Sequence, residues 1–144
     1  EAAAFLRRSG ADTGDVKKLF QNDLEGTIAK YDIIQNAKMY KAGIAVAKVD
    51  HTVGRITAAQ AADELLNIIG IDTSFVLYPD GERVIISARS MGDTNVQVIL
   101  EKLGGGGNAA TAGAQVPAGG QIAGKSLTQV SSELRRAIDQ YLEG

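Results

Sequence analysis

Residues 73–90 read TSFVLYPDGERVIISARS and carry the strongest hairpin signal in the chain. Residues 73–78 and 82–89 are rich in β-branched and aromatic residues, which favour strands. The Pro-Asp-Gly sequence at 79–81 consists of typical turn residues. The stretch therefore predicts two antiparallel strands joined by a tight turn.

A strand and a helix are expected before this hairpin. Residues 43–49, GIAVAKV, alternate and contain β-branched residues, which favours a strand. Thr57 and Gln60 have the spacing of a capping box. They predict a helix over residues 58–69 that ends at Gly70.

Two helices and a strand are expected after the hairpin. Residues 95–103 place their apolar side chains on one helical face, and residues 112–116 form a candidate strand. A Gly-rich connection over residues 117–125 leads to Ser126 and Gln129, which form a second capping box. The helix that begins there has an apolar stripe made of Leu127, Val130, Leu134, Ile138 and Tyr141.

The N-terminal part of the chain predicts helices alone. Residues 15–38 have the three-and-four spacing of an amphipathic helix, capped by Asp12 or Thr13. Residues 2–8 are alanine-rich and favour a short helix. We therefore expect residues 1–40 to be helical and free of strands.

This order of elements favours an α/β fold, in which a small mixed β-sheet is covered by helices and preceded by a helical N-terminal segment. We expect residues 1–40 to form that segment and residues 41–144 to form one domain. The hydrophobic content of 44% and the charged content of 22% are typical of a folded globular chain. The chain begins at Glu1 rather than at Met, so we expect it to be part of a longer protein.

The composition excludes several kinds of site. The chain has no Cys, which excludes cysteine nucleophiles and thiolate metal sites. Its one His does not support a Ser-His-Asp triad. His51 follows Asp50, but a catalytic zinc site takes about three protein ligands and no second histidine is present. The net charge of -2 gives no long-range attraction for nucleic acid. No apolar stretch approaches the roughly 20 residues of a membrane span.

Two short motifs are candidates for phosphate binding. The four consecutive glycines at 104–107 form either a flexible connection or a nest whose backbone N–H groups converge on an anion. Arg89 and Ser90 end the second strand of the hairpin, where a guanidinium and a hydroxyl could hold a phosphate. The alternative for Arg89 is an ordinary surface arginine at a strand end. One short helix separates the two motifs, so together they could enclose a phosphorylated ligand.

Four short motifs carry a resemblance to a known family. They are ISARS at 86–90, NVQ at 95–97, LGGGG at 103–107 and AGAQ at 112–115. Together they resemble the DHH-associated domain (DHHA type 1) at the C-terminus of DHH-family phosphoesterases. The Ala-Arg-Ser and Asn-Val-Gln elements are most similar to the GdpP-type cyclic-di-AMP phosphodiesterases. The opening EAAAFLRRSGADT resembles the segment that follows the DHH domain in those enzymes.

The resemblance implies a nucleotide-binding role and places catalysis outside this chain. In the family, aspartates and histidines of the DHH domain hold two manganese ions, so the catalytic residues and the manganese are expected upstream of Glu1. Asn108 stands where the family has the histidine of its Gly-Gly-Gly-His motif, so a neutral amide replaces that contact. Altered specificity, impaired catalysis and loss of activity would each fit this replacement. The implied substrate-binding residues are Arg89, Ser90, Gly104, Gly105, Gly106, Gly107, Asn108, Ala112 and Gly113.

The first functional hypothesis is the nucleotide-binding domain of a metal-dependent phosphodiesterase that hydrolyses cyclic-di-AMP. The alternatives are an oligoribonuclease or 3′-phosphoadenosine phosphate phosphatase domain, and a non-catalytic RNA-binding module like the C-terminal domain of alanyl-tRNA synthetases. The expected partners are a cyclic dinucleotide or short oligoribonucleotide, the upstream DHH domain and a second copy of the chain. We expect a cytoplasmic location without membrane contact, and any membrane anchor of the parent protein would lie outside this chain.

Overall fold

The computed structural model describes residues 13–117 and 126–144, with side chains described from residue 24 onward. The short helix expected over residues 2–8 and the Gly-rich connection up to residue 125 lie outside the described residues. The described helices are α2 (Thr13–Gln35), α3 (Arg55–Leu65), α4 (Val96–Glu101) and α5 (Leu127–Glu143). The described strands are β1 (Ala37–Met39), β2 (Ile44–Lys48), β3 (Thr73–Asp80), β4 (Arg83–Ser90), β5 (Gly106–Gly107) and β6 (Thr111–Pro117).

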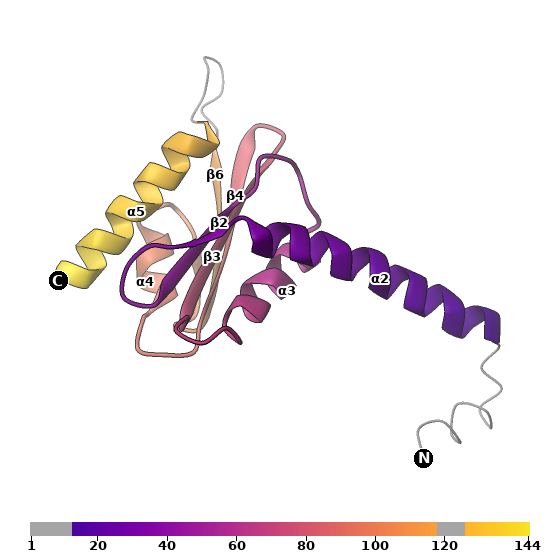
Figure 1. The fold of residues 1–144 in the computed structure, drawn as a ribbon. Coiled ribbons are helices and arrows are strands. Elements are labelled where there is room, and N and C mark those ends of the chain that lie inside the picture. The colour runs from indigo at the N-terminus through magenta and orange to yellow at the C-terminus, as the bar shows by residue number, and fades with distance from the viewer. Residues whose placement is uncertain (1–12, 118–125) are drawn as a thin grey trace.

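The strands form a single mixed sheet in the order β1-β2-β3-β4-β6-β5. The pairing of β2 with β3 is parallel and the other pairings are antiparallel. Helix α3 packs on one face of this sheet, and α4 and α5 pack on the opposite face (Figure 1). The predicted α/β fold with a small mixed sheet covered by helices is therefore confirmed.

The hairpin at the centre of the sheet forms as predicted, with a different turn. The register runs from Thr73 opposite Ser90 to Asp80 opposite Arg83. The turn is therefore the two residues after Asp80 rather than residues 79–81. Gly81 supplies the positive φ of 64° that a two-residue hairpin turn requires.

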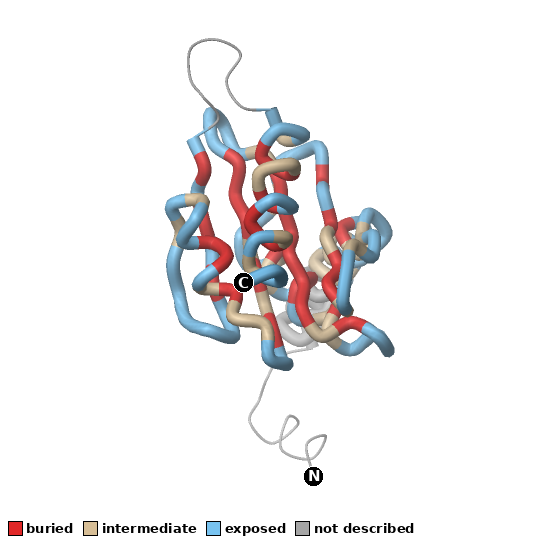
Figure 2. Tube along the Cα trace, turned by 90° about the vertical axis from the view of Figure 1, so that its left-hand side faces the viewer, coloured by how far each residue is buried: buried red, intermediate tan, exposed pale blue. Residues whose placement is uncertain are grey.

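Two apolar layers hold the helices on the sheet. Successive residues of β3 point to opposite faces, so Phe75 and Leu77 pack beneath α4 and α5, while Val76 and Tyr78 pack beneath α3. These side chains are fully buried. Figure 2, which faces the α4 and α5 side, shows the buried residues along the strands and the helices packed on them. The central strand is covered on both faces, which explains its continuous run of buried residues.

Two expectations about the first half of the chain were wrong. Helix α2 ends at Gln35, and residues 37–39 form strand β1, so the N-terminal segment is not free of strands. Helix α3 begins at Arg55, with Gly54 as an N-cap that has no side-chain hydrogen bond. The predicted capping box at Thr57 therefore falls inside the helix, where intrahelical bonding takes the place of a cap.

Both caps in the second half of the chain form locally. The Ser126 hydroxyl accepts from the Gln129 N–H and the Gln129 side chain accepts from the Ser126 N–H, so the predicted capping box of α5 is confirmed. Asn95 caps α4 by accepting from the Val98 N–H. The apolar stripe of α5 is also confirmed, because Val130, Leu134 and Ile138 are buried and Leu127 and Tyr141 pack against them.

Tyr78 gives a prediction about stability. Its side chain is fully buried, and its hydroxyl has no hydrogen-bond partner in the described chain. Burial raises the pKa of the phenol. We expect Tyr78→Phe to keep or raise the free energy of unfolding by up to about 1 kcal/mol, because it removes an unsatisfied buried polar group. Urea unfolding measures this change.

Tyr40→Phe is the matched control for that substitution. The Tyr40 hydroxyl donates to both carboxylate oxygens of Asp139 at 2.9 Å, so its removal should lower the free energy of unfolding. A loss of stability in Tyr78→Phe as large as in Tyr40→Phe would show instead that the Tyr78 hydroxyl makes a stabilising hydrogen bond.

Candidate functional site

The face of the sheet that carries α3 has an open half over β4, β6 and β5. In the sheet register, Ser87 lies opposite Gly113, and Gly113 lies opposite Gly106. Residues paired in this way point to the same face. Ser87, Gly113 and Gly106 therefore form a row with almost no side-chain volume, which we call the glycine floor.

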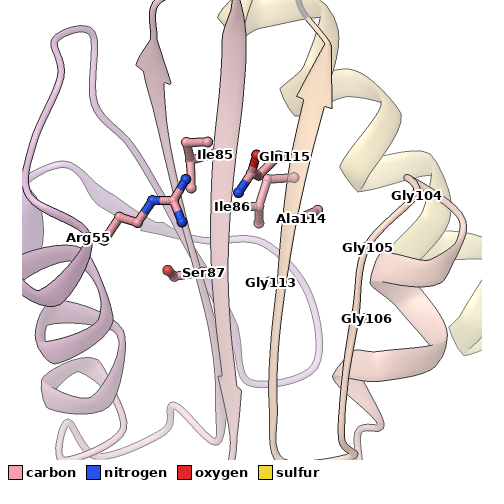
Figure 3. A pocket seen from close by; sticks show the side chains of 10 residues that line it. All are labelled: Arg55, Ile85, Ile86, Ser87, Gly104, Gly105, Gly106, Gly113, Ala114 and Gln115. Carbon is pink, nitrogen blue, oxygen red and sulfur yellow. The ribbon is translucent and has the colours of Figure 1, made fainter.

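A cavity of about 450 Å³ lies over the glycine floor. Arg55, at the start of α3, closes one side of it, and the glycine segment at 104–106 closes the other (Figure 3). Ile85 and Gln115 form the next row of the floor. The cavity is thus shallow and lined mainly by backbone, with one cationic side chain at its edge.

Arg89 lies on the same face, one row beyond Ser87. Its Nε lies 3.1 Å from Oδ1 of Asp63 on α3, and its Nη1 donates to the Ala88 carbonyl at 2.8 Å. The Arg89 side chain is 17% exposed and the Asp63 side chain is 63% exposed. Arg89 is therefore largely buried and is held in place by an exposed carboxylate.

Asn108 lies in the same row as Arg89. Thr111 lies opposite Arg89, and the Asn108 N–H donates to the Thr111 carbonyl at 2.7 Å. Asn108 Oδ1 accepts from the N–H groups of Ala110 and Thr111, so the side chain caps its own turn. Its Nδ2 makes no hydrogen bond within the described chain and remains as a donor for a ligand.

Ser90 and Ala112 lie on the opposite face from Arg89. Ser90 is buried, and its hydroxyl accepts from the Gly92 N–H at 3.3 Å and lies 3.5 Å from the Thr73 hydroxyl. Ala112 is buried in the apolar layer beneath α4 and α5. The structure therefore separates Arg89 from Ser90, because neighbouring strand residues point to opposite faces.

The four glycines at 104–107 have structural reasons of their own. Gly104 has a φ of 84° after α4, and its N–H donates to the Glu101 carbonyl. The Gly105 N–H donates to the Leu100 carbonyl at 2.8 Å. These two amides are consumed inside the chain, which argues against the anion nest. The flexible connection is also wrong, because the last two glycines form strand β5.

Close backbone contact explains the absence of side chains at two of these positions. A Cβ at Gly105 would lie 2.3 Å from the Gly113 carbonyl oxygen, and a Cβ at Gly107 would lie 2.3 Å from the Thr111 carbonyl oxygen. A Cβ at Gly106 would meet nothing within 4 Å. Gly105 and Gly107 therefore allow β5 to approach β6, whereas Gly106 leaves space above the floor.

Sequence reasoning missed three residues that line the cavity: Arg55, Ser87 and Gln115. Ser87 has the same strand parity as Arg89, so the two-residue period of β4 could have identified it. Gln115 joins the site through the pairing of β6 with β4, and Arg55 joins it through the packing of α3. No local sequence pattern predicts the contact of Gln115 or that of Arg55.

The described residues do not fit a manganese site. They contain no group of three or more His, Cys, Asp or Glu side chains that could hold a metal ion. His51 Nδ1 lies 3.1 Å from Asp50 Oδ1, without a third ligand among the described residues. Among the described helices, none combines the length and the apolar character that a membrane span needs.

Residues 41–144 match the family model of the DHHA1 domain, and the chain belongs to that family. The whole chain is 40% identical to the cyclic-di-AMP phosphodiesterase GdpP of Geobacillus thermodenitrificans and 39% identical to that of Bacillus subtilis. It spans 21% and 22% of the length of those proteins.

Solved structures share the fold at lower identity. An exopolyphosphatase-related protein from Bacteroides fragilis has a TM-score of 0.66 and 21% identity, over 96% of this chain and 42% of that one. The pGpG-specific phosphodiesterase PggH of Vibrio cholerae has a TM-score of 0.64 and 14% identity, over 92% and 44% of the two chains. The C-Ala domain of the Aquifex aeolicus alanyl-tRNA synthetase has a TM-score of 0.55 and 17% identity, over 74% and 99%.

Proposed function

We propose that this chain is the nucleotide-binding domain of a phosphodiesterase that hydrolyses cyclic-di-AMP, and that it contributes binding groups without catalytic ones. The observation that carries the proposal is the glycine floor with Arg89 one row away and Arg55 at its edge. The family membership and the relatives named as cyclic-di-AMP phosphodiesterases support the choice of substrate.

The floor suits a flat ligand. A planar base can lie close to the backbone of β6 and β5 because Gly113 and Gly106 carry no side chain. Ser87 adds a hydroxyl that can donate or accept a hydrogen bond in the same row. The nucleobase is therefore expected on the floor, with its phosphates directed toward the arginines.

Arg89 recognises the phosphate in this proposal. A guanidinium can form two parallel hydrogen bonds with a phosphate, and this geometry favours Arg over Lys. In the free domain Asp63 occupies one side of the guanidinium, so a phosphate must compete with this carboxylate. Asn108 Nδ2, in the same row, can add a neutral hydrogen bond.

The alternative substrates predicted from the sequence remain predictions. Short oligoribonucleotides and 3′-phosphoadenosine phosphate present the same base and phosphate chemistry, and an open floor would admit them. The manganese ions and the upstream DHH domain likewise remain part of the proposal, because this chain spans about a fifth of its curated relatives. Binding measurements with cyclic-di-AMP, linear pApA and 3′-phosphoadenosine phosphate on the 144-residue chain would rank the three ligands.

Gly106→Val tests the floor directly. We expect this substitution to weaken cyclic-di-AMP binding by about tenfold or more, because its side chain fills the ligand space. The fold should tolerate it, since a Cβ at Gly106 meets nothing within 4 Å and valine favours a strand. Isothermal titration calorimetry measures the dissociation constant, and urea unfolding checks the fold.

Gly26→Val is the matched control for the added volume. Gly26 lies on α2, and a Cβ there also meets nothing within 4 Å. This variant should bind cyclic-di-AMP like the unmodified chain. Unchanged binding by Gly106→Val would move the nucleotide away from the glycine floor.

A further inference from the structure

A second groove lies on the face of the sheet that carries α4 and α5, away from the glycine floor. It has a volume of about 330 Å³ and runs between the edge strands β1 and β2 and helix α5. Val46, on the same face as the apolar layer beneath α5, forms part of its floor. Ser131, which is 5% exposed, lines the α5 side. We call this cavity the basic groove.

Three cations line the basic groove, and none of its described lining residues is a carboxylate. The cations are Lys38 on β1, Lys48 on β2 and Arg135 on α5. Within the described chain none of the three forms an ion pair. Such an excess of positive charge stands out in a chain whose net charge is -2.

The two lysines repel one another across the strands. Lys38 lies opposite Val46, so Lys48 is its diagonal neighbour on the same face. Diagonal pairs lie about 7–8 Å apart at their Cα atoms, within reach of two long side chains. Like charges directly opposite one another destabilise a sheet, and two ammonium groups on diagonal positions repel one another more weakly. An anion bound between the two lysines would relieve this repulsion.

The carboxylate nearest along the helix, Asp139, interacts electrostatically with Arg135, but its hydrogen bonds go to Tyr40 and Lys41. Asp139, one turn after Arg135, accepts from Lys41 Nζ at 2.9 Å and from the Tyr40 hydroxyl at 2.9 Å. These hydrogen bonds, that of Lys41 first, lower the pKa of Asp139, and the charge of Arg135 lowers it further. The contact also fixes the Tyr40 ring, which lines the groove.

We propose that the basic groove is a second ligand site, which binds the phosphate of a mononucleotide through Lys38, Lys48 and Arg135. The ribose and base would lie along Tyr40 and Val46, and the Ser131 hydroxyl would contact the ligand. A cavity of 330 Å³ lies in the range of small-molecule sites, about 300–1,000 Å³. The site lies on the opposite face from the glycine floor and does not depend on the function proposed for that floor.

A titration of the 144-residue chain with adenosine 5′-monophosphate tests this proposal. Amide NMR signals of β1, β2 and the middle of α5 should shift on titration, and added salt should weaken the binding because charged contacts carry it. Adenosine alone should shift them less. Separate titrations with inorganic phosphate and with adenosine measure the contribution of the phosphate and that of the nucleoside.

Arg135→Gln and Arg136→Gln form a matched pair for the titration. Both arginines are exposed on α5 and both substitutions remove one charge, but only Arg135 lines the basic groove. Arg136 lies with Lys102 in a different depression. We expect Arg135→Gln to weaken binding by about fivefold or more and Arg136→Gln by less than about twofold.

Equal losses of affinity in these two variants would overturn the proposal, because they would indicate non-specific attraction. Loss of binding in Gly106→Val but not in Arg135→Gln would also overturn it, by placing the mononucleotide on the glycine floor. Lys48→Gln should lose affinity while its urea midpoint stays equal or rises, since it removes the repulsion with Lys38. Loss of both affinity and stability in Lys48→Gln would assign that lysine a structural role and overturn the proposal.

Discussion

Gly105→Ala is expected to lower the free energy of unfolding by about 3 kcal/mol or more, the upper range for overpacked positions. The added Cβ would lie 2.3 Å from the Gly113 carbonyl oxygen and 2.7 Å from Ala114 Cβ. Both neighbours belong to β6, which is paired with β4 along most of its length, so the backbone cannot yield cheaply. Urea unfolding followed by circular dichroism measures the loss.

Gly106→Ala is the adjacent control, with the opposite expectation. A Cβ at Gly106 has no neighbour within 4 Å, and this glycine is not among the residues with positive φ. Its free energy of unfolding should therefore stay within about 0.5 kcal/mol of the unmodified chain. Similar losses of stability in the two variants would mean that the run needs the backbone freedom of glycine at both positions, and that the close contact at Gly105 is not the cause.

This contrast between neighbouring glycines marks the limit of prediction from the sequence. The run at 104–107 is conspicuous in composition, but the composition is the same at each position. What separates Gly105 from Gly106 is how closely each approaches the backbone of β6, a tertiary contact that no residue type within the run encodes. The Ser126 capping box and the hairpin at residues 73–90 are predictable for the opposite reason, because their own residue types and spacing carry the signal.

Elements that depend on distant partners are harder to predict. Residues 37–39 have no strand pattern of their own, and they form β1 because β2 offers them a free edge. Ile68 and Ile69 fit a helix that continues to residue 69, yet they lie after the end of α3 at Leu65 and are 45% and 99% exposed. Their apolar character matches the helical pattern without being used in the core.

The candidate site was predicted in part for the same reason. Four of the expected site residues lie on the face that carries α3: Arg89, Gly106, Gly113 and Asn108. Ser90 and Ala112 point to the opposite face. The two-residue period of a strand is enough to separate Arg89 from Ser90. The ion pair of Arg89 with Asp63 is not accessible to sequence reasoning, because it depends on how α3 packs across the sheet.

We expect Arg89→Ala to raise the dissociation constant for cyclic-di-AMP by about tenfold or more, equivalent to about 1.4 kcal/mol. In the proposed site the Arg89 guanidinium would form a bidentate phosphate contact, and Asp63 and the Ala88 carbonyl hold it in position. Arg89→Lys should restore part of the loss, because an ammonium cannot reproduce the bidentate geometry. Calorimetric titration measures all three proteins.

Asp63→Asn separates recognition of phosphate from a structural role of Arg89. If phosphate competes with Asp63 for the guanidinium, removing the carboxylate charge should tighten cyclic-di-AMP binding severalfold and leave the fold intact, because Asp63 is largely exposed. In the Arg89→Ala background the same substitution should have little effect, since the group that both anions contact is gone. An unchanged dissociation constant in Arg89→Ala, or tightening by Asp63→Asn that persists without Arg89, would place the phosphate elsewhere on the domain.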